Sequence, residues 1–190
     1  MIETELKFFV RDYQSLREEL NRHASARNLR YNDQYFNHRQ LDFEVHDSEF
    51  RIRRITDESD ASTRTVLTYK ADIIDPLTES KHEYEIMISS SQQETRQLVE
   101  AMGFDCYIEF EKICEHYEFE VEGRRVAATI VSLNEVADRF VEIETLIAET
   151  DDSAAALEWL SIFAASLGLS TEDQTVVTYE GTVARARQSA

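Results

Sequence analysis

The amino-acid sequence predicts an α+β fold in which an eight-stranded antiparallel β-sheet closes, or nearly closes, into a barrel with helices packed outside it. One observation is that strand-like segments follow one another directly along the chain, which favours antiparallel neighbours. A second is that these segments alternate charged and apolar residues with a period of two. The 190 residues include one proline and four glycines and show no linker, so we expect residues 1–190 to form a single domain.

The expected strands, in chain order, are residues 2–10, 34–37, 41–45, 49–55, 64–71, 81–88, 106–121, 124–133 and 139–148. The segments at 34–37 and 41–45 are short extended pieces, so the total is about eight strands. Pro76 lies in an expected loop, and Gly123 provides the turn of a hairpin between the strands on either side of it.

Three helices are expected between these strands. Asp12 and Ser153 are the predicted N-caps of the first and third helices, and Ser91 with Glu94 forms a capping box for the second. The expected buried positions are Tyr13, Leu16 and Leu20 in the first helix, Leu98, Val99 and Met102 in the second, and Leu157, Leu160, Phe163, Ala164 and Leu167 in the third. Near the end of the chain, β-branched residues at 176–179 favour a short edge strand.

Charge and composition exclude several classes of function. The net charge of −18 argues against a nucleic-acid or anionic-membrane partner, because a polyanion would be repelled. No apolar run approaches the ~20 residues of a membrane span, and the acidic N-terminus does not resemble a signal peptide. Cys106 and Cys114 would lie ~27 Å apart on one strand, too far for a disulfide. We therefore expect a cytoplasmic protein with free thiols.

The charged residues of the predicted strands fall on one face of each strand. They comprise three Glu-x-Glu pairs (Glu3 and Glu5, Glu83 and Glu85, Glu142 and Glu144) and six bases (Lys7, Arg51, Arg53, Lys70, Lys81 and Lys112). This face is either an ordinary solvated surface or the lining of a barrel whose apolar outside is covered by helices. The balance of six carboxylates and six bases favours the lining. Carboxylates suit divalent cations, and arginines bind phosphate oxygens in bidentate fashion.

These residues resemble a known family. Residues 3–7, Glu-Thr-Glu-Leu-Lys, match the Glu-x-Glu-x-Lys signature of the CYTH superfamily, the triphosphate tunnel metalloenzymes, and residues 34–36, 50–53, 67–70, 81–85 and 140–144 resemble further family motifs in the same order. The resemblance spans about residues 1–148 and implies an eight-stranded antiparallel barrel that forms a tunnel. Two positions depart from the pattern: Cys114 stands where a second base is usual, and Asn134 where an aspartate is usual.

The resemblance implies a divalent-metal-dependent phosphohydrolase. Its substrate would be inorganic tripolyphosphate, thiamine triphosphate or a nucleoside triphosphate. The implied Mg²⁺ or Mn²⁺ ligands are Glu3, Glu5, Glu142 and Glu144, assisted by Glu83 and Glu85, and the implied phosphate-binding residues are Lys7, Arg51, Arg53, Lys70, Lys81 and Lys112. Lys112 is either a general base or a phosphate ligand, and Tyr35 either orients the nucleophile or packs the barrel wall.

Two alternatives stay open at this point. The same clamp would serve a class IV adenylyl cyclase, which makes cyclic AMP and pyrophosphate from ATP. Cys114 and Asn134 also leave open a non-catalytic polyphosphate-binding module. The sequence is compatible with either a monomer or a homodimer.

Overall fold

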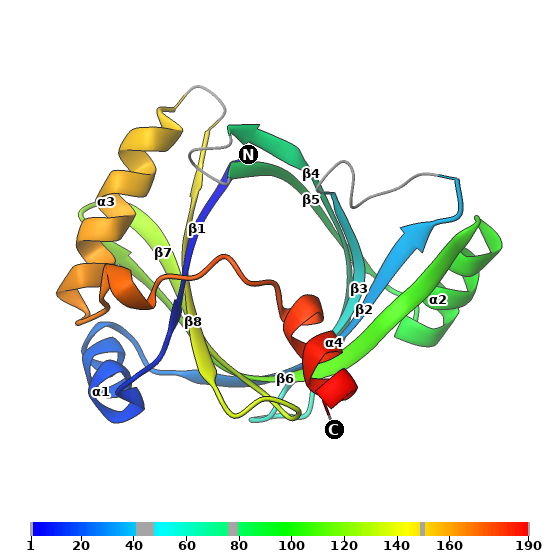
Figure 1. The fold of residues 1–190 in the computed structure, drawn as a ribbon, viewed down its shortest axis with the longest axis horizontal. Helices are drawn as coiled ribbons and strands as arrows, with labels where there is room; N and C mark the ends of the chain where they lie inside the picture. The colour runs from blue at the N-terminus through cyan, green and yellow to red at the C-terminus, as the bar shows by residue number, and fades with distance from the viewer. Residues whose placement is uncertain (1, 41–47, 76–79, 149–150, 190) are drawn as a thin grey trace.

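The computed structural model describes residues 2–40, 48–75, 80–148 and 151–189, without the side chains of residues 2, 72–75, 80 and 81. Its strands form a closed antiparallel barrel in the order β1-β5-β4-β3-β2-β6-β7-β8, which confirms the predicted fold class (Figure 1). The strands are β1 (Ile2–Phe9), β2 (Arg27–His38), β3 (Glu49–Asp57), β4 (Thr63–Asp75), β5 (Ser80–Ile88), β6 (Phe104–Val121), β7 (Arg124–Leu133) and β8 (Arg139–Ile147). The helices are α1 (Tyr13–His23), α2 (Gln92–Ala101), α3 (Ser153–Ser166), the 3-10 turn η1 (Thr171–Asp173) and α4 (Tyr179–Ser189).

The second strand is longer than its sequence pattern suggests. A short piece at 34–37 was expected, but β2 runs from Arg27 to His38 because it is hydrogen-bonded to β3 on one side and β6 on the other. Pairing on both edges holds polar residues extended where propensity alone would not. The expected segment 41–45 and Pro76 lie outside the described residues.

Register in the barrel brings the charged residues of different strands together. The first strand pairs with the last along its whole length, with Glu5 opposite Glu144 and Lys7 opposite Glu142. Because opposite residues in a ladder project to the same side of the sheet, these side chains share the inner face. On its other edge β1 pairs with β5 through Ile2–His82 and Glu3–Lys81.

Helices cover much of the outer face. α1 and α3 bury Leu16, Leu20 and Leu160 against Leu6 and Ile143, while α2 places Val99 on β2 and β3 (Figure 1). Each large side chain buried in this way contributes ~1.5–3 kcal/mol. On β5, however, Tyr84 and Ile86 are 62% and 56% exposed, so the expectation that helices cover every apolar strand face is wrong there.

Several helix details differ from prediction. Leu98 of α2 and its C-cap residue Met102 are exposed because the helix contacts the sheet through one stripe, Gln92, Thr95 and Val99. Leu157 and Tyr13 are partly buried at the edge of the core. The N-cap of α3 is Asp152, one residue before the predicted Ser153, and its carboxylate accepts from the amides of the first turn.

The C-terminal segment is not the predicted edge strand. Within it, Gln174 forms an isolated bridge with Phe8, the amide of Thr175 donates to the Lys7 carbonyl at 2.9 Å, and α4 begins at Tyr179. The chain thus passes from α3 across one mouth of the barrel before entering α4 (Figure 1). Both cysteines are free, as expected. In the described part of the chain, no helix is long and apolar enough to cross a membrane.

Candidate functional site

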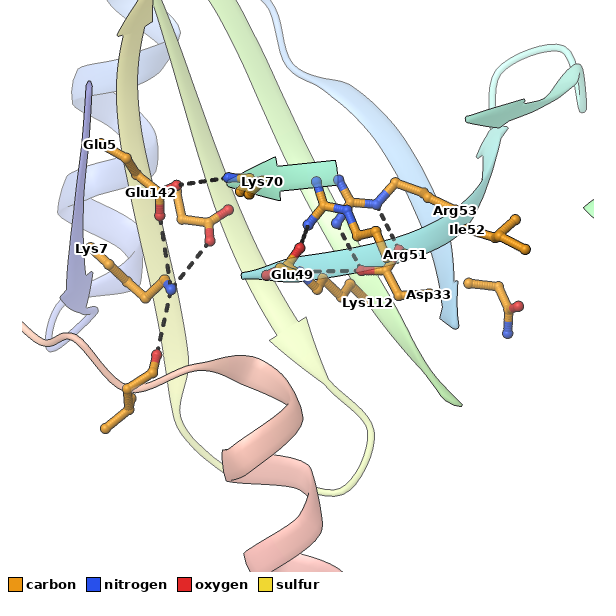
Figure 2. Close-up of polar contacts among 12 residues, drawn as sticks. Glu5, Lys7, Asp33, Glu49, Arg51, Ile52, Arg53, Lys70, Lys112 and Glu142 are labelled. Atoms are coloured by element: carbon orange, nitrogen blue, oxygen red, sulfur yellow. Dashed lines mark hydrogen bonds and ion pairs between the residues drawn. The ribbon is translucent and has the colours of Figure 1, made fainter. Parts of the chain in front are cut away.

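The charged faces of the strands enclose a small pocket inside the barrel. Its volume is about 100 Å³, and we call it the interior pocket. It is lined by Glu3, Glu5, Lys7, Tyr35, Glu49, Arg51, Arg53, Lys70, Lys112, Glu142, Glu144, Thr178, Tyr179 and Glu180. The strands therefore present their charges inward, and the pocket has an acidic side on β1 and β8 and a basic side on β3 and β6 (Figure 2).

The acidic side can hold a divalent cation. Carboxylate oxygens of Glu3, Glu5 and Glu144 lie within 4.8 Å of one another. Like charges this close are unfavourable unless a proton or a cation lies between them. Oxygen donors that converge in this way are the ligands preferred by Mg²⁺ and Mn²⁺, so the donor set fits the metal that the sequence predicts.

The protonation of this cluster reflects that crowding. Burial, followed by the charge of Glu142, raises the pKa of Glu5 to about 7. Burial and the neighbouring Glu3 and Glu5 likewise raise the pKa of Glu144 well above its usual range. In contrast, although burial opposes it, Lys70 holds the pKa of Glu3 at about 2. The cluster therefore retains protons near neutral pH that a bound metal would displace.

Two lysines bridge the acidic side. Lys70 Nζ lies 2.7 Å from Glu3 Oε2 and 3.9 Å from Glu5 Oε2. Lys7 Nζ lies 3.6 Å from Glu142 Oε1 and 3.8 Å from Glu5 Oε1 (Figure 2). Although burial opposes it, these carboxylates raise the pKa of both lysines, so each remains a cation that can also bind a phosphate oxygen.

The basic side is organised around Asp33, which the sequence analysis did not single out. Both oxygens of this fully buried carboxylate accept from Arg53, at 2.6 and 2.7 Å, and Lys112 Nζ lies 3.3 Å away (Figure 2). Arg51 contacts Glu49 at 3.2 Å and Glu83 at 4.0 Å. Although burial opposes it, Arg53 and Lys112 hold the pKa of Asp33 well below its usual range.

The C-terminal helix completes one wall of the pocket. The ring centroid of Tyr179 lies 3.8 Å from Lys112 Nζ and 4.5 Å from Lys7 Nζ, a cation–π contact with each lysine. Lys7 also donates to the carbonyl of Val177 at 3.4 Å. These contacts bring the start of α4 to Lys7 of β1 and Lys112 of β6.

Comparison with known proteins identifies the family and the fold. Residues 1–179 match the family described as the CYTH domain. The chain belongs to the CYTH domain family. The match ends at Tyr179, so most of α4 lies beyond it. A comparison with curated proteins finds no match.

Solved structures share this CYTH fold over nearly the whole chain. The PH1819 protein of Pyrococcus horikoshii has a TM-score of 0.82 and 26% identity, covering 96% of this chain and 98% of its own. A candidate adenylate cyclase from Vibrio parahaemolyticus has a TM-score of 0.77 and 16% identity, covering 97% and 98%. HpAC1 from Hippeastrum, a candidate adenylyl cyclase with a dominant triphosphatase activity, has a TM-score of 0.58 and 16% identity, covering 97% and 95%.

Most of the predicted site residues line the interior pocket, but Glu83 and Glu85 are not part of its described lining. Glu83 lies near Arg51 at the edge of the acidic side, and burial raises its pKa to about 7. Glu85 is exposed and accepts from the Thr68 hydroxyl at 3.4 Å, apart from the acidic cluster. Lys81 pairs with Glu3 through the backbone, but its side chain lies outside the described part of the structure.

The two departures from the CYTH pattern also have clear locations. Cys114 is buried among apolar residues of the barrel, and burial raises the pKa of its thiol to about 12, so it cannot replace a cation. Asn134 is exposed. Of the two catalytic candidates, Tyr35 is 2% exposed and stacks on Phe110, and burial lowers the pKa of Lys112.

Proposed function

We propose that this CYTH protein is a divalent-metal-dependent phosphohydrolase that acts on a triphosphate. Members of the family are triphosphatases or adenylyl cyclases. The observation that carries the proposal is the division of one enclosed pocket into a carboxylate cluster and a cation cluster. The first suits a hard metal ion and the second suits phosphate oxygens.

In this proposal each side of the pocket has a distinct task. Glu3, Glu5 and Glu144, with Glu142 beside them, would hold Mg²⁺ or Mn²⁺. The metal would supply Lewis acidity towards a phosphoryl oxygen. Phosphate oxygens would be bound by Lys7, Arg51, Arg53, Lys70 and Lys112, with Lys81 as a further proposed ligand. Glu83, which lies 4.0 Å from Arg51, would assist the metal ligands.

Catalysis of phosphoryl transfer depends mainly on positioning and on charge stabilisation. Arg51 is 8% exposed and Lys112 3% exposed, so both act in a site with little water, where electrostatic interactions are strong. Lys112, whose pKa is lowered by burial, is the candidate to accept a proton from the attacking water; otherwise it binds phosphate alone. The buried Tyr35 would form the wall beside the nucleophile.

Hydrolysis is preferred over cyclisation because water needs no dedicated pocket. Apart from Tyr35, Tyr179 and Thr178, the described lining is entirely charged, and a nucleobase would find little apolar surface there. The cyclase alternative is supported by the likeness to the Vibrio protein, and the triphosphatase by the likeness to HpAC1.

A small-molecule triphosphate is the proposed partner. The pairing of the first and last strands supports a single domain.

The test is phosphate release from tripolyphosphate, thiamine triphosphate and ATP, each with Mg²⁺ and with Mn²⁺, together with a cyclic AMP assay. Metal-dependent phosphate release supports the hydrolase. Cyclic AMP and pyrophosphate from ATP would indicate the cyclase instead. Tight tripolyphosphate binding without any product would indicate a binding module.

A further inference from the structure

Asp33 lies between two of the proposed phosphate-binding cations, yet it belongs to none of the charged motifs. β2 lies between β3 and β6 in the barrel. On β3 the register partner of Asp33 is Arg53, and on β6 Lys112 pairs with Tyr31, two residues from Asp33 on the same face. Topology therefore brings one cation from each neighbouring strand to a single carboxylate.

The contacts of Arg53 fix the orientation of its guanidinium group, which attraction between two charges alone would not do. Nε and Nη2 donate to the two oxygens of Asp33 at 2.6 and 2.7 Å, a bidentate arrangement. The guanidinium also lies over the Tyr31 ring, 4.4 Å from its centroid. Asp33 uses two of the five N–H groups of the guanidinium, which leaves three for a ligand.

Fold stability alone is a poor reason for this arrangement. The carboxylate is 0% exposed, and the barrel interior beside it contains Leu29, Tyr31 and Phe110. Burying charges costs several kcal/mol per ion, and apolar replacements of similar volume are often as stable. The grouping of Asp33, Arg53 and Lys112 therefore points to a role in the interior pocket, which Arg53 and Lys112 line and Asp33 supports.

We propose that Asp33 is a positioning residue for the phosphate-binding side: it holds Arg53 and Lys112 in the geometry that the transferring phosphoryl group requires. This inference rests on the proposed function. Asp33 also offsets positive charge that would otherwise attract the substrate in its ground state. Its removal should therefore impair the transition state more than substrate binding.

The test is steady-state hydrolysis of tripolyphosphate with Mn²⁺ by the full-length D33N variant, which keeps the shape of the side chain. The expected result is a kcat at least tenfold lower with KM unchanged or lower. D57N is the matched control, because Asp57 forms an ion pair with Arg27 at 2.9 Å between the same two strands, outside the pocket, and both constants should stay at the wild-type values. A D33N variant with a raised KM and an unchanged kcat would overturn the proposal.

One further variant, D33E, keeps the proposal testable if D33N does not fold, and a double variant tests the coupling to Arg53 if it does. D33E retains the charge but moves it by roughly one carbon–carbon bond, ~1.5 Å, so kcat should fall although charge balance is kept; full activity of folded D33E contradicts positioning. R53K removes the bidentate contact, so D33N should lower kcat less in the R53K background than in the wild type, where Asp33 positions both cations. Independent, multiplicative losses in the double variant would show that Asp33 does not act through Arg53.

Calorimetric titration with tripolyphosphate separates this inference from the proposed function. Wild-type protein that neither binds nor hydrolyses tripolyphosphate contradicts both. Wild-type turnover that D33N and D33E leave unchanged contradicts the positioning role alone, while a selective loss of kcat in folded variants supports it.

Discussion

Replacing Glu5 by Gln separates two properties of the acidic cluster: the repulsion between its carboxylates and its binding of a metal ion. The side chain keeps its shape but loses a charge that lies beside Glu3, Glu142 and Glu144. Its ion pairs with Lys7 and Lys70 are long, 3.8 and 3.9 Å, so little direct attraction is lost. The variant should therefore relieve repulsion in the metal-free protein and remove a ligand from the metal-loaded one.

The magnitude follows from the pKa of Glu5. That pKa is about 7 in the folded protein, against an ordinary value of 4.5. Because the folded state binds the proton more tightly, the contribution of Glu5 to the free energy of unfolding of the metal-free wild type falls as pH rises from 4.5 to 7 and is constant above that. The difference corresponds to ~3 kcal/mol. E5Q lacks this cost, so its advantage should be near zero at pH 4.5 and ~1–3 kcal/mol at pH 8.

Urea unfolding with EDTA at pH 5 and pH 8, followed by circular dichroism, measures this difference. The same experiment with Mn²⁺ should reverse the order at pH 8, because ligand binding stabilises only the protein that binds it. E5Q should also lose metal-dependent turnover. A variant destabilised equally at both pH values would refute the proposed repulsion, and a variant with full turnover would refute the metal role.

Three other results are expected. R51A should raise the KM for tripolyphosphate about tenfold to a hundredfold, because a charge-assisted hydrogen bond contributes ~1.5–3 kcal/mol to binding. R54A is the control, since Arg54 lies on the same strand but is exposed, and its KM should stay unchanged. Equal effects of the two variants would contradict the assignment of Arg51 to the inner face of the barrel. Mn²⁺ should bind more tightly at pH 8 than at pH 6 and should release protons, which calorimetry in buffers of different ionisation enthalpy measures. E144Q should lose both the pH dependence and the proton release, whereas E85Q, at an exposed carboxylate, should keep them. Y179A should lower the free energy of unfolding by ~3–5 kcal/mol, with Y179F as the control that keeps the ring; a small loss in both would show that α4 is not anchored by this side chain.

Much of the fold and the pocket could be predicted because strand alternation is a strict geometric rule. Once Glu3, Glu5 and Lys7 share a face, closing the sheet decides whether they meet Glu142 and Glu144. The same rule placed Glu85 inward, but it carries no information about how far each pair of neighbouring strands stays paired. Glu85 is exposed although its parity is that of the pocket residues, because the described pairing of β5 with β1 extends only to His82.

Asp33 and Tyr179 could not be found in this way. Asp33 stands in a mixed polar run, Asn32-Asp33-Gln34, and its importance arises from neighbours on β3 and β6 that are distant in sequence. The β-branched residues before Tyr179 favour a strand locally, yet tertiary contacts override that preference and seat Tyr179 and Val183 in the core. Both cases depend on long-range contacts that propensity does not encode.

The pairing of β1 with β8 delays closure of the barrel during folding. The residues of β1 pair along their whole length only with Arg139–Ile147, far along the chain, and the wall of the pocket is completed later still, at Tyr179. Such distant pairing gives a high contact order, which slows folding. During synthesis the barrel cannot close until Arg139–Ile147 has been made, so Glu3, Glu5 and Lys7 remain in water until then.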